Sequence, residues 1–145
     1  MGKKKVTETT TKAEGAPEAA AATVTVKRSK RVEAGRVYVN ASYNNTIVSV
    51  TDVQGNLLAW ATAGSLGFSG PKKATPFAAS KIVAVLAEKM KAVGMSEIDV
   101  IVKGIGGGRD SAVRSFVNQG FLVHSLKDVT PVPHNGARPK KTRRV

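Results

Sequence analysis

The 145-residue sequence contains no cysteine, and aromatic residues make up only 5% of it. Without cysteine there is no disulfide framework and no thiolate metal site, and the chain suits a reducing cytosol. The scarcity of aromatic side chains argues against a platform that stacks successive single-stranded bases. The longest apolar run, 82–87, is far too short to span a bilayer, and glutamates at 8, 14 and 18 interrupt any signal-peptide core. We therefore expect a cytoplasmic protein without a targeting segment or a membrane partner.

The motifs of nucleotide-dependent enzymes and of zinc sites are missing as well. A glycine fingerprint that begins at Gly104 and Gly106 would need its third glycine at Arg109, and no G-K-[ST] sequence occurs. His124 and His134 stand ten positions apart, with no metal-ligand spacing around them. We predict no cofactor, no metal and no small-molecule substrate.

A metal-dependent nuclease is the enzyme class that needs a closer look. Carboxylates would have to bridge its two cations, and Asp99 and Asp128 can face each other if their strands are neighbours. The first predicted strand carries no acid, however, and Glu88 falls on the exposed side of its predicted helix. These carboxylates do not build a two-metal site, so we predict that the protein is not an enzyme.

What the sequence has in excess is positive charge, with 23 Lys and Arg against 10 Asp and Glu and a net charge of +13. A surplus of this size on a small chain attracts polyanions. Residues 131–145 combine five basic residues with three prolines and no acid, and they have little to bury. We expect this basic C-terminal extension to be disordered until a polyanion orders it. The basic N-terminal tail, residues 1–34, is also expected to be disordered in isolation, which leaves one domain over 35–130.

The periodicity of apolar residues within this domain predicts five strands and two helices. Alternation or β-branched runs indicate strands over 37–42, 47–53, 57–63, 98–102 and 121–129. Helical spacing follows Thr75 as one N-cap, and Asp110 or Ser111 as the other. The order βββαβαβ indicates an α/β fold with a five-stranded mixed sheet that begins as an antiparallel meander. We expect the strand over 98–102 to be buried on both faces, and Trp60 to be packed in the core.

Two glycine-rich loops, 64–73 and 104–109, each precede a predicted helix. In one interpretation, backbone amides and the positive end of the helix dipole face a phosphate. In the other, glycines only allow the chain to reverse direction. The excess of positive charge favours phosphate contact. The candidate contacts in these loops are Lys72, Lys73, Lys103, Gly104, Gly106, Gly108 and Arg109.

Another basic cluster stands just before the first strand and consists of Lys27, Arg28, Lys30 and Arg31. It suits contact with a phosphate backbone, and the alternative is a solvated arm. Together with the two loops and the C-terminal extension, it offers several separate phosphate-contacting surfaces. Such a set suits a large folded RNA better than a short ligand. The predicted function is therefore RNA binding through shape and backbone.

Several blocks of the sequence resemble the universal small-subunit ribosomal protein S-eleven family, in its bacterial type. The blocks are ASYNNTIV (41–48), GN (55–56), WATAG (60–64), GF (67–68), TPFAA (75–79), VKG (102–104), GR (108–109) and DVTPVPHNG (128–136), followed by the basic tail. They occur in the family's order and span about residues 35 to 145. No single block is decisive, but the set is highly specific.

This resemblance implies a three-layer α/β fold and a structural constituent of the small ribosomal subunit. It implies binding to ribosomal RNA of the platform, a part in shaping the mRNA exit region near the E site, and mRNA and proteins of the S-seven and S-eighteen families as neighbours. A general basic RNA-binding or RNA-chaperone module outside the ribosome is the alternative. The family's RNA-facing segments match Asn44, Asn45, Lys72, Lys73, the 104–109 loop, and His134, Asn135, Arg138, Lys140, Lys141, Arg143 and Arg144 of the tail.

The chain departs from the family pattern at three positions. Ile105 and Gly107 stand where the family usually has prolines, which predicts a less rigid loop before binding. Ser69 stands where the family usually has a basic residue, so the resemblance does not carry an RNA contact over to this position.

Overall fold

The computed structural model describes residues 31–142 of the chain. Its elements follow in the order β1 (Ala34–Ala41), β2 (Thr46–Asp52), β3 (Leu57–Thr62), α1 (Pro76–Val93), β4 (Glu97–Lys103), α2 (Gly108–Asn118) and β5 (Leu122–Asp128). Two short 3-10 helices, η1 (Gly64–Leu66) and η2 (Gly70–Ala74), lie between β3 and α1. The predicted α/β class and element order are confirmed. Most of the predicted N-terminal tail lies outside the described residues.

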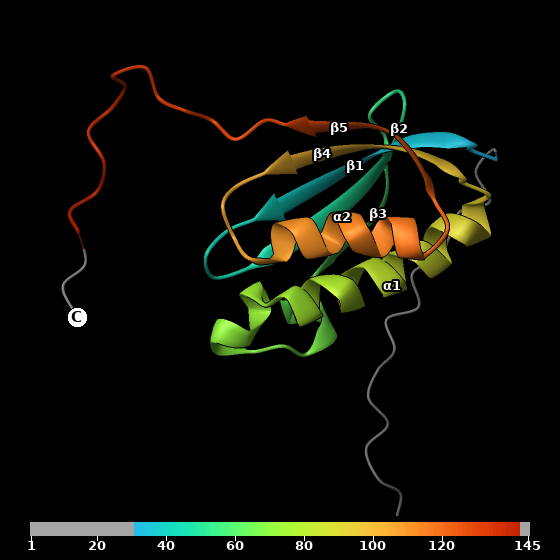
Figure 1. The fold of residues 1–145 in the computed structure, drawn as a ribbon, viewed down its shortest axis with the longest axis horizontal. Helices are drawn as coiled ribbons and strands as arrows, with labels where there is room; N and C mark the ends of the chain where they lie inside the picture. Colours follow the sequence, from blue (N-terminus) through green and yellow to red (C-terminus); the bar gives the residue numbers. More distant parts are fainter. Residues whose placement is uncertain (1–30, 143–145) are drawn as a thin grey trace, which may run out of the picture.

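The five strands form one mixed sheet in the order β3-β2-β1-β4-β5 (Figure 1). β1 and β2 are antiparallel, as are β2 and β3, so the first three strands form the predicted meander. β4 lies parallel to β1 on its other side, and β5 lies parallel to β4. The strand that the chain reaches first therefore lies at the centre of the sheet, and β3 and β5 form its two edges.

Both helices cover the same face of the sheet, α1 over β2 and β3 and α2 over β1 and β4. The strand residues on that face are buried, and in β1 and β4 they are Val37, Val39, Ala41, Ile98, Val100 and Val102. The described residues thus form two layers, where three were expected. The expectation that β4 is buried on both faces is also wrong, because Asp99 and Ile101 on the other face are only half-buried.

The strand order explains why both helices of the described chain lie in one layer. The connections β3-α1-β4 and β4-α2-β5 each join parallel strands, and both move in the same direction across the sheet. Crossovers that share the usual right-handed sense and the same direction place their helices on the same side. The element order alone leaves this direction open, because it does not tell where β4 is inserted.

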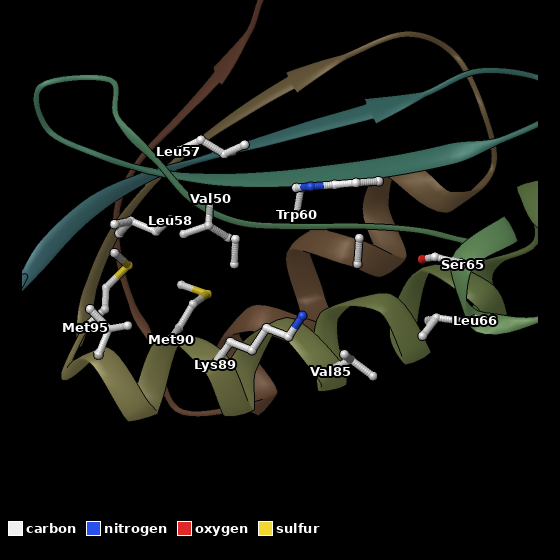
Figure 2. A pocket seen from close by; sticks show the side chains of 13 residues that line it. Val50, Leu57, Leu58, Trp60, Ser65, Leu66, Val85, Lys89, Met90 and Met95 are labelled. Carbon is white, nitrogen blue, oxygen red and sulfur yellow. The ribbon is translucent and has the colours of Figure 1, made fainter. Parts of the chain in front are cut away.

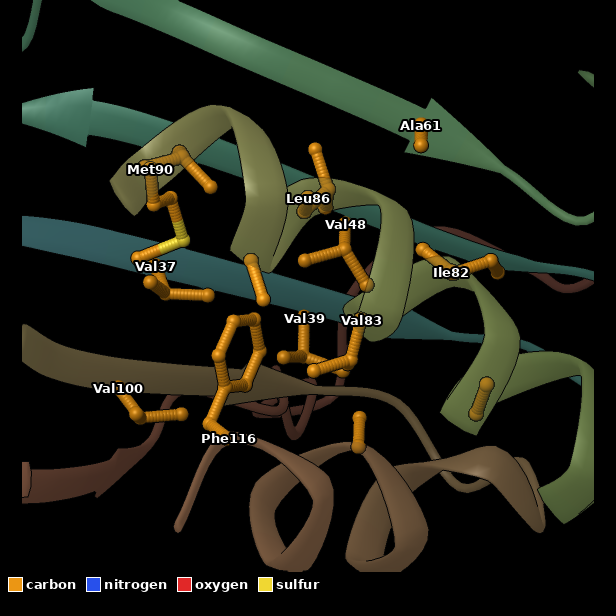
Figure 3. Close-up of a cluster of buried hydrophobic side chains, with 14 of the residues drawn as sticks. Val37, Val39, Val48, Ala61, Ile82, Val83, Leu86, Met90, Val100 and Phe116 are labelled. Carbon is orange, nitrogen blue, oxygen red and sulfur yellow. The ribbon is translucent and has the colours of Figure 1, made fainter. Parts of the chain in front are cut away.

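The core lies between the sheet and the two helices. Phe116 of α2 is fully buried and points toward Val39 and Val100 of the sheet and toward α1 (Figure 3). Trp60, in contrast, is 56% exposed, so its predicted place in the core is wrong. The register pairs Trp60 with Ser49 and Ala61 with buried Val48, so alternation on β3 turns the small residue inward.

The caps of α1 confirm their prediction, whereas α2 begins earlier than predicted. The Thr75 hydroxyl accepts a hydrogen bond from the Ala78 N–H at 3.3 Å, and Gly94 ends α1 with a φ of 89°. α2 begins at Gly108, and no side chain caps it. Ser111, one of its two predicted caps, instead donates from its hydroxyl to the Pro76 carbonyl of α1 at 2.9 Å.

Phe116→Ala is expected to lower the free energy of unfolding by about 3–5 kcal/mol, because it removes the largest fully buried side chain of the core. Val117→Ala, one position along the same helix, is the matched control, since Val117 is 56% exposed. We expect the control to change stability by no more than about 0.5 kcal/mol. Urea unfolding measures both, and equal losses would contradict the described orientation of α2.

Candidate RNA interface

The loops predicted to contact RNA meet at one end of the sheet, on the left in Figure 1. We call residues 42–45, 64–75 and 103–109 together the loop end. The Gly106 N–H donates to the Ala41 carbonyl at 2.9 Å, and the Ala63 N–H donates to the Thr46 carbonyl at 3.2 Å. Two segments that are distant in the sequence are thereby tied to the same β1-β2 connection.

The turn between β1 and β2 is held by its own polar groups. The Ser42 N–H donates to the Asn45 carbonyl at 2.9 Å, and the Asn45 N–H donates to the Ser42 hydroxyl at 3.1 Å. The Asn45 side-chain oxygen accepts from the Thr46 N–H at 3.0 Å. Asn45 therefore shapes the turn, while Asn44 beside it is exposed. Of the two predicted RNA contacts in this turn, Asn44 is the accessible one.

Glycine is required at positions 104 and 106 because the two loops approach each other so closely. A Cβ on Gly104 would lie 2.1 Å from the Ala41 carbonyl oxygen, and one on Gly106 would lie 2.3 Å from the Ser42 carbonyl oxygen. The φ of Gly104 is also positive, at 98°. Gly104 and Gly106 therefore act as the second interpretation of the glycine loops describes: they allow the backbone to pack closely and to reverse direction.

Gly108 and Gly107 differ from this pair and from each other. Gly108 is buried, and a Cβ on it would lie 2.7 Å from the Thr46 hydroxyl oxygen, which is itself buried without a hydrogen-bond partner among the described residues. Gly107 is exposed and has a φ of −66°, with its nearest neighbour 3.8 Å from a built Cβ. Only Gly107 has room for a side chain.

Arg109 connects the glycine loop to the end of β5. Its guanidinium donates through Nη1 to the Gly104 carbonyl at 3.1 Å and forms an ion pair through Nη2 with Asp128. The other carboxylate oxygen of Asp128 accepts from the Thr130 N–H at 2.9 Å and from its hydroxyl at 2.6 Å. The Gly104 N–H in turn donates to the Thr130 hydroxyl oxygen at 3.1 Å. We call this closed ring of Gly104, Arg109, Asp128 and Thr130 the Arg109 latch.

The Arg109 latch lowers the pKa of Asp128 to about 2 from an ordinary value of 3.8. The hydrogen bond from the Thr130 hydroxyl is the largest cause, followed by that from the Thr130 N–H and then by Arg109. The carboxylate is therefore ionised at neutral pH and holds Thr130 in place. Since Thr130 is the last residue before the C-terminal extension, the latch fixes the point at which the extension leaves the sheet.

The remaining predicted cations differ in how accessible they are. Lys72 and Lys103 are exposed and Lys73 is half-buried, all at the loop end. In the extension, the predicted contacts His134, Asn135, Arg138, Lys140 and Lys141 are all exposed. Arg31 is separate from them, because its side chain lies beside Gly94 at the opposite end of the sheet. The predicted contacts Lys27, Arg28, Lys30, Arg143 and Arg144 lie outside the described residues.

Comparison with known proteins decides the family. The sequence model of the family described as ribosomal protein S11 matches residues 35–144. The chain belongs to the ribosomal protein S11 family. Two relatives, each named small ribosomal subunit protein uS11, come from two strains of Treponema pallidum, one of them the Nichols strain. Each is 51% identical to the chain over 119 residues, which cover 82% of this chain and 94% of the relative.

Membership of the S11 family confirms the central functional prediction. The protein is a structural constituent of the small ribosomal subunit, a cytoplasmic ribonucleoprotein that acts in translation, and it is not an enzyme. Its partners are ribosomal RNA and other ribosomal proteins. The alternative, an RNA-binding or chaperone module outside the ribosome, is not supported. Over residues 31–142, no helix is long and apolar enough to cross a membrane.

The two aspartates considered for a nuclease site each have a different partner in the fold. Asp99 pairs in register with Ser125, and its carboxylate accepts from that hydroxyl at 2.6 Å. Asp128 pairs with Val102 and belongs to the Arg109 latch, so the two aspartates do not face each other. The described part of the chain contains no group of three or more His, Asp or Glu that could hold a metal ion.

The sequence analysis did not predict the role of Asp128 in the Arg109 latch, although Asp-x-Thr is a spacing typical of side-chain-capped turns.

Gly106→Ala is expected to destabilise the protein by about 1–3 kcal/mol or more, because neither loop backbone can move away from the added Cβ without loss of the Ala41–Gly106 hydrogen bond. Gly107→Ala is the matched control, and we expect it to remain within about 0.5 kcal/mol of the parent protein. Chemical denaturation measures both variants. A tolerated Gly106→Ala would show that the loops are not in close contact.

Thr130→Val is expected to raise the pKa of Asp128 from about 2 toward 3.8, and by more than Arg109→Gln does, because the Thr130 hydroxyl is the larger cause. A carbon NMR titration of the Asp128 carboxyl measures both variants. Since the folded-state pKa is depressed, the latch contributes stability above about pH 4 and loses it as the pH falls through about 2. A larger shift in Arg109→Gln would show that the ion pair dominates instead.

Proposed function

We propose that the protein binds ribosomal RNA of the small-subunit platform through the loop end and the C-terminal extension. The proposal includes a place beside mRNA in the exit region near the E site, with proteins of the S-seven and S-eighteen families as neighbours. The observation that carries it is that the candidate loops and the root of the basic extension lie at one end of the sheet. A single RNA surface can therefore meet all of them at once.

The individual residues have different parts in this proposal. Lys72, Lys73 and Lys103 offer charges to phosphates, and Asn44 offers an accessible amide. Arg109 already pairs with Asp128, so it acts mainly by aiming the extension and only secondarily as a phosphate contact. Gly104, Gly106 and Gly108 position the loop backbone. In the extension, the proposed contacts are His134, Asn135, Arg138, Lys140, Lys141, Arg143 and Arg144.

The basic cluster at Lys27, Arg28, Lys30 and Arg31 would contact a second part of the RNA. Arg31 lies beyond the start of β1, whereas the loop end lies beyond its end. The eight residues of β1 span about 26 Å. The two contact regions are therefore farther apart than the width of a nucleic-acid groove. In this proposal, residues 35–130 form the RNA-binding domain, residues 1–34 and 131–145 are its tails, and RNA orders the basic segments of both tails.

A salt titration of RNA binding tests the proposal. The parent protein should bind a platform rRNA fragment far more tightly than an unrelated RNA duplex. If six to ten phosphates are contacted, affinity should fall roughly 10³- to 10⁵-fold between about 50 and 200 mM salt. Deletion of residues 137–145 removes five basic residues and should reduce the slope of log affinity against log salt by up to about four. Its thermal unfolding should remain that of the parent, because the described part of this segment is exposed.

Two matched double variants separate the loop end from charge in general. Lys72→Gln with Lys103→Gln removes two exposed cations of the loop end, and the salt slope should fall by about 1.5. Lys91→Gln with Arg114→Gln removes two exposed cations from the helices, and the slope should stay unchanged. Equal affinity for both RNAs, or equal effects of the two double variants, would contradict the proposal.

A further inference from the structure

A groove of about 520 Å³ runs between the edge strand β3 and α1; one end of it reaches Ser65 and Leu66 of the loop end, but none of the proposed RNA contacts lines it. Val50 and Leu58 point into it from the sheet, and Val85 and Met90 line it from the helix (Figure 2). Met95, just after α1, closes one end. Lys89 is the one charged residue that lines this groove. An apolar channel of this kind suits apolar side chains and offers almost nothing to a phosphate backbone.

The strand that borders the groove is an unprotected edge. Within the described residues, β3 is paired with β2 on one side only. Its six residues, LLAWAT, contain no charge and no proline, and Leu57 and Trp60 are 58% and 56% exposed. The opposite edge, β5, carries Lys127 and Asp128. Exposed edges normally carry charges or prolines that prevent pairing with another chain, so an edge without either is expected to be covered in the working protein.

The described chain begins next to the end of this groove. The Arg31 Cγ lies 4.0 Å from a Cβ built on Gly94, and the Glu33 carbonyl accepts from the Ser96 and Glu97 N–H groups at 3.0 and 3.1 Å. The residues on either side of Gly94, Val93 and Met95, both line the groove. The chain that precedes Arg31 is therefore attached at the mouth of the groove.

That preceding chain contains a segment of matching chemistry. Residues 19–26 read AAAATVTV, eight residues without a charge between Glu18 and Lys27. Thr and Val alternate in its second half, which places Val24 and Val26 on one face of an extended strand and Thr23 and Thr25 on the other. The five steps from Val26 to Arg31 reach at most about 17 Å, which is enough to pass the end of a helix about 10–12 Å wide.

We propose that residues 19–26 add a sixth strand to the free edge of β3, with Val24 and Val26 inserted into the groove. Because the segment is attached at the Met95 end, near the start of β3, it runs antiparallel to β3. Its backbone then pairs with the outward N–H and C=O groups of that strand, and its apolar side chains cover Leu58 and Met90. This occupant belongs to the chain itself, and the proposal does not depend on which RNA the protein binds.

The test uses the full chain and two double variants that differ only in which face carries the charges. Val24→Asp with Val26→Asp places two carboxylates in the groove, whereas Thr23→Asp with Thr25→Asp places them on the opposite face. Both changes lie outside the described fold, so circular dichroism should show that each variant remains folded. The readouts are hydrogen exchange of the β3 amides that β2 does not engage, and acrylamide quenching of Trp60, the only tryptophan.

In the parent protein, the outward β3 amides should exchange about tenfold or more slowly than in the Val24→Asp, Val26→Asp variant. Quenching of Trp60 should rise in that variant as the sixth strand leaves the edge, and Thr23→Asp with Thr25→Asp should match the parent in amide exchange. Rapid exchange of these amides in the parent would overturn the proposal. So would equal effects of the two double variants. Protection that increases with protein concentration would also overturn it, because a second copy of the chain would then cover the edge.

Discussion

The close approach of the 104–109 loop to the end of β1 is the constraint on which the rest of the structure depends. The Gly106 N–H reaches the Ala41 carbonyl at 2.9 Å only because no Cβ stands between the two backbones. The parallel β1-β4 ladder brings the glycine loop to the same end of the sheet as the β1-β2 turn. The close contact then packs the loop directly against that turn. The glycines therefore contribute to the RNA interface first by shaping it, and only then through exposed amides.

A second consequence concerns how charge is distributed at the loop end. Arg109 forms an ion pair with Asp128, while Lys72 and Lys103 remain exposed. The pairing holds Thr130 and thereby the root of a segment that carries most of the local positive charge. The interface thus combines a rigid part, in which Arg109 and Asp128 are already paired, with an extension whose cations are all exposed over the described residues. The rigid part fixes the direction in which the extension leaves the sheet, and the cations of the extension attract the RNA phosphates.

Much of this fold could be predicted from the sequence, because periodicity, caps and turns are local signals. The strands and α1, with its Thr75 and Gly94 caps, followed from such signals. The errors concern tertiary facts. Trp60 was assigned to the core because an apolar residue on a strand does not reveal which face is covered. The start of α2 was placed too late because the fit of Gly108 against Thr46 is not local. The φ of Gly107 is −66°, a value that proline also adopts. The proline usual in the family would therefore fit this backbone, and glycine at this position leaves the loop less rigid.

The N-terminal tail and the C-terminal extension join the described domain at opposite ends of the sheet, at Arg31 and at Thr130. If both arms hold RNA, the protein is a bivalent ligand whose spacing is set by a rigid β-sheet. Once one arm is bound, the other searches a small volume at high effective concentration, so the pair gains avidity that neither arm has alone. Such a molecule would fasten two RNA elements at a fixed distance. It would also lose most of its affinity for the RNA if those elements moved farther apart than the two arms can reach.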